Sequence, residues 1–480
     1  MYRTRFAPSP TGSLHLGGAR TALYNWLFAK HHHGAFILRV EDTDVERSTE
    51  AAMEQQISSL LWLGLNWDEG VRPNGQVELG ALGPYRQSRR SDMYQQMAQQ
   101  LLDQGLAYYC FMSDDEQEAL RTDVGKTHYQ VQSPYRDLPM SEAKKRIEAG
   151  EQPSIRFKVP QTSRDIFFRD LIRGDIRLTT EMLADFVIIR SNGLPVYNFC
   201  CVADDHLMHV SHVLRGEEHL SNSLKQLLIY QAFGWRAPEF GHLSIILGED
   251  GKKLSKRNGA ASLDDYHAKG ILPEALINYL ALLGWSHPDG EEYFDVATLT
   301  AAFSLDRVHA SSAQFDWQKL LWLNSEHIKR MSIDDFLEKV KPWLKGITYP
   351  NNEWLKRALS LIQGDVKTLA DIPDQLQLLL GDGPMDDACH TVMSWPSTAA
   401  LLTVVNDRLS HLDGDYLEPD EFKSLLKQLK TELGVKGKEL FMPLRCIFIC
   451  QAQGAELAAL ITLVTIDQMQ KNIRRLRGLV

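Results

Sequence analysis

The first part of the chain alternates between short apolar runs and segments whose apolar residues follow helical spacing. Residues 2–7 predict a strand, and a loop with two prolines then leads into a predicted helix over residues 18–32. Gly34 ends this helix and precedes a second apolar run, residues 35–40, which predicts a buried parallel strand. Strands and helices that alternate in this way predict an open α/β sheet.

The pattern changes twice further along the chain. Between residues 86 and 193 short strands and helices are mixed, which predicts a block that interrupts the α/β pattern. A second α/β segment opens at residue 194, with a strand expected over residues 209–214 and a helix over residues 221–233. From residue 263 the pattern predicts amphipathic helices broken by glycines and prolines, and nothing there is typical of a β-barrel.

Composition narrows the class of protein. The 480 residues are 44% hydrophobic and 24% charged, which is ordinary for a globular chain with room for three or more packed units. No uninterrupted apolar stretch approaches membrane-spanning length and the N-terminus has no apolar signal core, so we expect no membrane. The six cysteines form no disulfide framework, which indicates a reducing, cytoplasmic location.

The net charge of the chain gives only a weak indication of whether its partner is a nucleic acid. The formal charge of −10 argues against a nucleic-acid partner, but binding depends on where basic residues cluster rather than on their total. Arg474, Arg475 and Arg477 form one such cluster near the C-terminus. A nucleic-acid contact and a solubilising tail explain this cluster equally well.

The loop before the first predicted helix carries candidate phosphate-binding residues. His15 is followed by Gly17 and Gly18, which stand at the start of the helix. Glycines there let a ligand approach free backbone N–H groups, whose partial charge of about +0.5 attracts phosphate. His15 can add a hydrogen bond to the same anion. By itself, a His-x-Gly sequence is explained as well by an ordinary strand–turn–helix corner.

Two further segments carry candidate chemistry. Glu41 follows the strand of residues 35–40, and acids at the carboxyl end of a strand in an open α/β sheet face the ligand crevice. Such an acid could hold an ammonium group, although a capping turn is the alternative. The pentapeptide Lys253-Leu254-Ser255-Lys256-Arg257 is strongly basic, and an isolated pentapeptide of this kind is usually solvated surface.

These segments together resemble a known enzyme family. The run from Arg5 to Arg20, with His15-Leu16-Gly17-Gly18, resembles the first signature of class I aminoacyl-tRNA synthetases in the form found in bacterial glutamyl-tRNA synthetases. The pentapeptide 253–257 resembles their second signature, Lys-Met-Ser-Lys-Ser, and follows in the expected order. The resemblance covers essentially the whole chain.

The resemblance implies a fold. We expect a Rossmann-type α/β class I catalytic domain with a mixed α/β connective insertion, followed by an all-α anticodon-binding region. The expected boundaries are 1–85 for the first catalytic half, 86–193 for the acceptor-binding insertion, 194–248 for the second catalytic half, 249–322 for a stem-contact region with the Lys-Leu-Ser-Lys-Arg loop, and 323–480 for the anticodon-binding region.

The resemblance also implies an activity, namely ATP- and Mg²⁺-dependent ligation of L-glutamate to tRNA through a glutamyl-adenylate. Catalytic roles fall to His15, Lys253 and Lys256. ATP-binding positions are His15, Gly17, Gly18, Glu218, His219, Ile246, Lys253 and Lys256. Glutamate-binding positions are Arg5, Ala7, Ser9, Glu41, Tyr197 and Arg215.

The chemistry of glutamate fits two of these residues. Arg5 and Arg215 offer fixed positive charge for carboxylates, and glutamine would leave such an arginine partly unpaired. No editing domain is therefore expected. We expect no zinc, because Cys110 has no second cysteine nearby, His128 stands alone, and structural zinc takes about four ligands.

Three questions stay open at this stage. The stretch Gln363-Gly364-Asp365 lacks an arginine often found in members that accept only glutamate tRNA, which prompts the hypothesis that glutamine tRNA is glutamylated as well, or mainly. A truncated relative that modifies a tRNA nucleoside and a catalytically inactive tRNA-binding paralogue are the alternative functions. We expect a monomer, although the sequence does not establish the oligomeric state.

Overall fold

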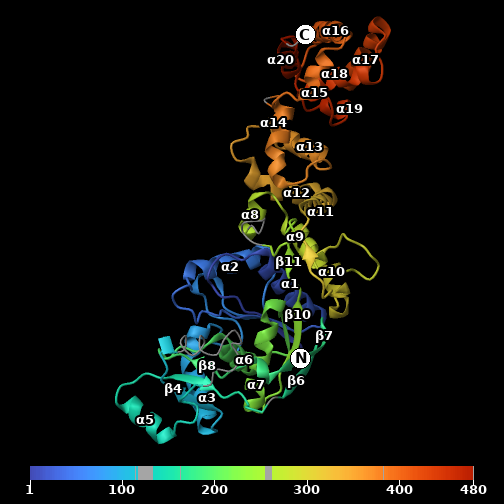
Figure 1. The fold of residues 1–480 in the computed structure, drawn as a ribbon. Helices are drawn as coiled ribbons and strands as arrows, with labels where there is room; N and C mark the ends of the chain where they lie inside the picture. The colour runs from blue at the N-terminus through green and yellow to red at the C-terminus, as the bar shows by residue number, and fades with distance from the viewer. Residues whose placement is uncertain (114, 117–132, 163, 255–261, 382, 479–480) are drawn as a thin grey trace. The chain divides into compact units, whose positions relative to one another are not determined.

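The chain divides into two compact units. The computed structural model describes residues 1–480 except 114, 117–132, 163, 255–261, 382 and 479–480. The N-terminal unit consists of Met1–Tyr266 and Pro273–Trp317, and the C-terminal unit of His267–Leu272 and Gln318–Val480 (Figure 1).

Parallel strands form the centre of the N-terminal unit. Strand β1 (Arg3–Phe6) pairs in parallel with β2 (Ala35–Leu38), which pairs with β3 (Glu69–Gly70). All residues of β2 are buried, which explains its continuous apolar sequence. The second sheet has the order β7-β6-β10-β9. Its strands are β6 (Asp165–Asp170), β7 (Gly174–Thr179), β9 (His212–Gly216) and β10 (Glu239–Leu243).

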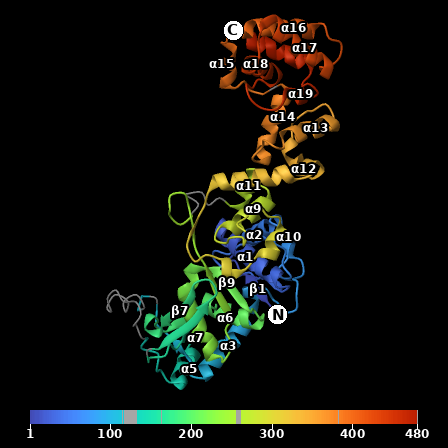
Figure 2. The ribbon, with the colours of Figure 1, turned by 90° about the vertical axis from the view of Figure 1, so that its right-hand side faces the viewer.

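Helix α1 (Leu16–His31) holds the two sheets together. The side-chain amide of Asn25 donates to the carbonyl of Leu214 in β9 at 2.9 Å, and the carbonyl of Asn25 accepts the hydroxyl of Thr4 in β1 at 2.8 Å. On its other side α1 lies beside α9 (Pro273–Leu282) and α10 (Val296–Ala302), as Figure 2 shows. Helix α1 is therefore held against both β1 and β9.

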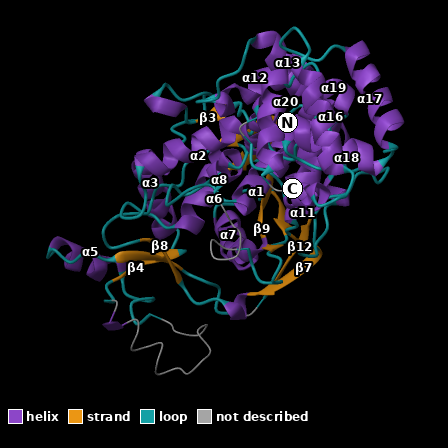
Figure 3. Cartoon of the chain, turned by 90° about the horizontal axis from the view of Figure 1, so that it is seen from above, coloured by secondary structure: helices purple, strands orange, loops and turns teal. Residues whose placement is uncertain are grey.

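A smaller antiparallel sheet lies apart from these strands in Figure 3. It contains β4 (Ala107–Cys110), β5 (Ser154–Phe157) and β8 (Phe186–Ile189), in that order. The hairpin β6–β7 comes from the same stretch of chain but joins β10, with Phe240 opposite Asp170. Residues 86–193 are thus divided between two sheets, and the domain boundaries expected from the sequence stay predictions.

The strand predicted over residues 209–214 was wrong at its start, because β9 begins at His212. His209 has a φ of 53°, and the N–H of Val210 donates to the carbonyl of Asp205 at 2.8 Å. Residues 209 and 210 therefore close helix α6 (Tyr197–Leu207) rather than begin a strand. The hydrophobic pattern also missed β6, β7 and β10. In β6 the burial does not follow the hydrophobicity of the residues, because Phe167 is exposed and Asp170 is buried.

The N-terminal unit has further helices, of which Leu220–Ala232 lies within one residue of each end of the helix expected over residues 221–233. They are α2 (Glu50–Trp62), α3 (Ser91–Asp103), α5 (Met140–Glu148) and α7 (Leu220–Ala232). Helix α8 (Leu263–Ala268) runs across the division between the units, and the two-residue strands β11 (Ile246–Leu247) and β12 (Ala313–Gln314) pair with each other.

The C-terminal unit confirms the predicted change to helical structure. Its described residues after Gln318 form helices and turns, without a strand. The helices are α11 (Trp317–Arg330), α12 (Ile333–Val340), α13 (Asn352–Ile362), α14 (Ile372–Leu380), α15 (Asp387–Met393), α16 (Thr398–Ser410), α17 (Pro419–Leu433), α18 (Lys438–Ile449), α19 (Leu457–Leu460) and α20 (Ile466–Arg477). In the part of the chain that the structure describes, no helix has the length and apolarity needed to span a bilayer.

Candidate active site

A cavity of about 540 Å³ lies in the N-terminal unit, where the carboxyl ends of the parallel strands meet the start of α1. Every site residue predicted from the sequence that the structure describes lines this cavity. These residues are Arg5, Ala7, Ser9, His15, Gly17, Gly18, Glu41, Tyr197, Arg215, Glu218, His219, Ile246 and Lys253. Lys256 lies outside the described residues. The structure thus brings the candidates together, while their individual roles stay predictions.

His15 caps α1 at one end of the cavity. Its Nδ1 accepts the backbone N–H of Gly18 at 3.2 Å, so a neutral imidazole at this position carries its proton on Nε2. A Cβ atom on Gly18 would approach the Leu14 side chain to 2.8 Å, so a larger residue here would require that side chain to move. The combination provides a histidine N–H and a helix N-terminus, both of which favour an anion.

The segment with the basic pentapeptide begins and ends at the same cavity. Lys253 bridges to Leu247 of β11, and the N–H of Leu254 donates to the carbonyl of Ile246 at 2.9 Å. Ser262, where the described chain resumes, pairs with His15 in an isolated bridge. Two segments more than two hundred residues apart in sequence are therefore joined by backbone pairing at one site.

His219 and Tyr197 also line the cavity. The Tyr197 hydroxyl and Nδ1 of His219 are 3.4 Å apart, and Nδ1 of His219 is also 3.2 Å from the side-chain amide of Asn222. Burial, helped by the charge of Arg215, lowers the pKa of His219 to about 4. His219 is therefore neutral near pH 7, and it can hydrogen-bond an uncharged ring such as a nucleobase without adding charge.

Arg215, near the end of β9, lines the cavity and has no carboxylate partner among the described residues. Its Nε donates to Nε2 of His242 at 3.3 Å and its Nη2 to the hydroxyl of Ser223 at 2.8 Å. Its Nη1 is buried and has no hydrogen-bond partner in the described chain. An unpaired donor on a buried cation is costly unless an acceptor arrives, so this position suits a carboxylate ligand.

Arg5 and Glu41 are arranged differently, because each already has an ionic partner. Arg5 pairs with Asp205 at 3.1 Å and Glu41 with Arg39 at 3.1 Å. Burial raises the pKa of Glu41, against the opposing effect of Arg39. A bound ammonium group would favour the ionised form of Glu41 and so gain from this arrangement.

These two residues belong to a buried network of six charged side chains. Arg39 is fully buried and contacts Glu41, Asp204 and Asp205. Arg90 adds a contact to Asp204 at 2.7 Å. With Arg5 the network contains three arginines and three carboxylates, whose formal charges cancel.

Sequence reasoning missed several of these residues. Arg39, Asp204 and Asp205 were given no role, although an arginine inside the apolar run 35–40 indicates a buried ionic partner. Asp170, Ser223 and His242, which surround Arg215, were missed as well. No local pattern marks them, because they come from three separate elements.

Among the described residues no group of three or more histidine, cysteine or acidic side chains is arranged to hold a metal ion. Cys110 is buried, and its Sγ lies 3.3 Å from the hydroxyl of Ser133. His128 lies outside the described residues. The absence of zinc stays a prediction.

Comparisons with known proteins decide the family. Residues 1–322 match the family model "tRNA synthetases class I (E and Q), catalytic domain", and residues 335–477 match the model "Anticodon binding domain". Glutamate–tRNA ligase from Bdellovibrio bacteriovorus is 43% identical over 472 residues, covering 96% of this chain and 95% of that protein. Glutamate–tRNA ligase from Bacillus subtilis is 39% identical over 486 residues, covering 98% and 99%.

A solved structure agrees with these matches. The glutamate tRNA ligase from Elizabethkingia meningosepticum, crystallised in complex with its amino acid, has a TM-score of 0.88 at 32% identity and covers 99% of each chain. The chain belongs to the glutamate–tRNA ligase family.

Membership in this family confirms the fold predicted from the two signatures, a class I catalytic domain followed by a helical anticodon-binding domain. The match over residues 335–477 speaks against the truncated nucleoside-modifying relative, and the catalytically inactive alternative finds no support. Class I tRNA synthetases in general use ATP and Mg²⁺.

Proposed function

We propose that this chain ligates L-glutamate to the 3′ end of tRNA through a glutamyl-adenylate, releasing pyrophosphate and then AMP. The observation that carries the proposal is the combination of residues that line this cavity. It combines a helix N-terminus capped by His15, which suits phosphate, with the carboxylate-free cation Arg215. The names of the full-length relatives support the same activity.

In the first step an α-carboxylate oxygen of glutamate attacks the α-phosphorus of ATP, and the bond to pyrophosphate breaks. Arg215 would pair with the side-chain carboxylate and Glu41 with the α-ammonium group. His15, the N-terminus of α1 and the lysines of the basic loop would neutralise charge that grows on the phosphates. The protein thus positions reactants and supplies charge, without donating a nucleophile.

In the second step a hydroxyl of the terminal tRNA ribose attacks the glutamyl carbonyl carbon, and AMP leaves. The described residues offer no cluster of acids for a resident metal, so Mg²⁺ would enter on the ATP phosphates and screen their charge.

The buried, unpaired cysteines fit a reducing, cytoplasmic location. We propose a monomer.

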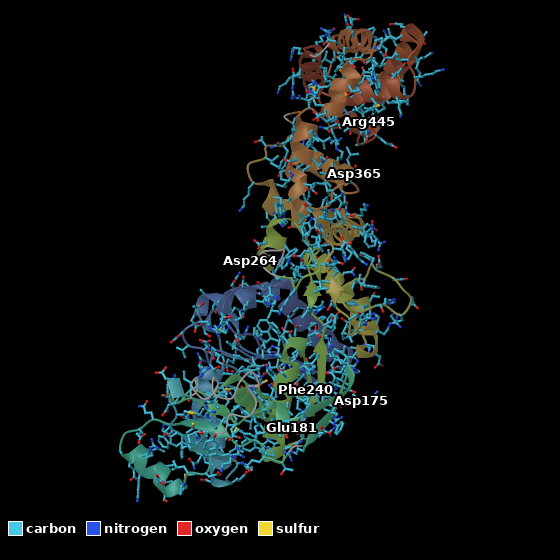
Figure 4. All side chains as sticks on the ribbon, viewed as in Figure 1. Asp175, Glu181, Phe240, Asp264, Asp365 and Arg445 are labelled. Atoms are coloured by element: carbon cyan, nitrogen blue, oxygen red, sulfur yellow. The ribbon has the colours of Figure 1, made fainter. Side chains whose placement is uncertain are left out.

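The C-terminal unit would carry the choice of tRNA. Gln363 donates from its side-chain amide to the carbonyls of Ile328 and Met331 at 2.7 and 2.8 Å, so it stabilises the end of α11 instead of presenting a side chain to a ligand. Asp365, labelled in Figure 4, is exposed in the turn after α13. The stretch Gln363-Gly364-Asp365 thus carries no arginine, which supports use of glutamine tRNA as well.

The direct test is ATP–pyrophosphate exchange with the purified full-length chain, with and without tRNA. We expect exchange that depends on L-glutamate and is absent with L-glutamine, with glutamylation of tRNA in a parallel assay. Exchange that ignores glutamate, or tRNA binding without any exchange, would contradict the proposal.

A further inference from the structure

Arg215 is held by a chain of hydrogen bonds that reaches from β9 through β10 to β6. Nε of Arg215 donates to Nε2 of His242 at 3.3 Å, and Nδ1 of His242 lies 2.5 Å from the carboxylate of Asp170. Asp170 and His242 are buried, at 1% and 0% exposure. Three residues that are distant in sequence thus form one continuous chain of hydrogen bonds that ends at Arg215 in the cavity lining.

The carboxylate of Asp170 is fixed by backbone donors. Its Oδ1 accepts the N–H groups of Ile172, Arg173 and His242, at 2.9, 2.9 and 3.2 Å. Its Oδ2 is thereby left to accept from the imidazole of His242. Because Asp170 can only accept when ionised, the ring proton of His242 belongs on Nδ1.

The other ring nitrogen of His242, Nε2, is then a hydrogen-bond acceptor. Nε2 of His242 faces Nε of Arg215 and the hydroxyl of Ser223, which is 3.1 Å away. Burial lowers the pKa of His242, against the effect of Asp170, so the ring is neutral near pH 7. A neutral acceptor orients the guanidinium without cancelling its charge, which leaves that charge for the ligand.

We propose that Asp170 and His242 are positioning residues that set the tautomer behind Arg215 and thereby hold its guanidinium for the side-chain carboxylate of glutamate. This inference rests on the proposed function and deepens it. A carboxylate placed directly against Arg215 would hold it equally well but would satisfy its charge, and selection of an anionic side chain would weaken.

The variant Asp170→Asn tests whether Asp170 sets the tautomer of His242. The amide oxygen would keep the three backbone donors, and the amide NH₂ would then face Nδ1 of His242. The ring proton would move to Nε2, where it opposes the Nε–H of Arg215. We expect the KM for glutamate to rise about tenfold or more, with the KM for ATP changed by less than about twofold, in ATP–pyrophosphate exchange.

Two further variants complete the experiment. Asp165→Asn, on the same strand but in an exposed pair with Arg177, is the matched control and should leave both KM values unchanged. Ser223→Ala removes the acceptor of Nη2 without changing the tautomer, and should raise the glutamate KM by a smaller factor.

The possible failures are distinguishable. Loss of glutamate-dependent exchange in the unmodified protein would overturn the proposed function itself. Normal exchange in the unmodified protein, with an unchanged glutamate KM in both Asp170→Asn and Ser223→Ala, would overturn only the positioning role. Equal increases in both KM values for Asp170→Asn would also overturn it, because they would indicate general damage to the site.

Discussion

At the scale of single residues, the cavity lining contains both charged side chains and side chains that burial keeps neutral. Lys253 lines the cavity, and Lys256 follows three residues later, outside the described chain. A lysine is a compact point charge on a flexible stem, suited to a phosphate whose charge grows during the reaction. His219, in contrast, is kept neutral by burial.

Lys256→Ala should lower the rate of glutamate-dependent ATP–pyrophosphate exchange by about a hundredfold or more, because a preorganised donor to the transition state typically contributes about 2.7–4 kcal/mol. Lys252→Ala is the matched control, since Lys252 is exposed in the preceding turn and is absent from the cavity lining. An undiminished rate in Lys256→Ala would count against the two-signature mechanism.

His219 should also make the stability of the protein depend on pH. Its pKa is about 4 in the folded chain, against about 6.5 when unfolded. Between these values the unfolded state binds the extra proton, so the free energy of unfolding should fall as the pH falls from about 6.5 to about 4.

Urea denaturation at several pH values measures this effect. His219→Gln should give a flatter pH dependence than the unmodified chain in that window. Identical slopes for the two proteins would show that the environment of His219 does not favour its neutral form.

At the scale of elements, buried charges join the first and second catalytic halves. Arg39, at the end of β2, contacts Asp204 and Asp205 of α6, and Arg5 of β1 contacts Asp205 as well. Burial alone would raise the pKa of Asp205, but the charges of Arg5 and Arg39 outweigh it and lower that pKa. The two halves therefore depend on one another through charge compensation.

Arg39→Met should destabilise the N-terminal unit by about 3–5 kcal/mol, because it leaves two aspartates buried with less compensating charge. Denaturant unfolding followed by circular dichroism measures the change. Arg47→Met is the control: its ion pair with Asp44 is exposed to solvent, and stability should barely change. Equal stability of Arg39→Met and the unmodified chain would contradict the role of the network.

At the scale of the whole molecule, the cavity and the anticodon-binding helices belong to different units. The N-terminal unit contains the cavity, and the C-terminal unit contains the helices that match the anticodon-binding family. The C-terminal unit has its own buried core, for example Trp354, whose indole N–H donates to the carbonyl of Leu463 at 2.9 Å. We therefore expect that activation and tRNA choice can be altered separately.

Asp365→Arg should reduce glutamylation of glutamine tRNA relative to glutamate tRNA, because it places a cation in this exposed turn without disturbing Gln363. Charging assays with purified isoacceptors measure the ratio, and Asp365→Ala separates loss of the acid from gain of the cation. Exclusive charging of glutamate tRNA by the unmodified chain would rule out the hypothesis.

Much of the architecture was predictable because it rests on local chemistry. The glycine pair at the start of α1, the apolar strand β2 and the helical spacing beyond residue 263 depend on residues that are close in sequence. Strand β9 was misplaced by three residues because the left-handed turn at His209 leaves no mark in the hydrophobic pattern.

The sequence by itself indicated the family, the alternation of strands and helices near the N-terminus, and the candidate residues that prove to line the cavity, because the two signatures are contiguous segments. Only the tertiary structure determined which charged residues pair with one another. Arg39 meets Asp205 across 166 positions and His242 meets Asp170 across 72, and such pairings depend on which strands become neighbours. For that reason Arg5 is part of a balanced ionic network, while Arg215 has no carboxylate partner among the described residues.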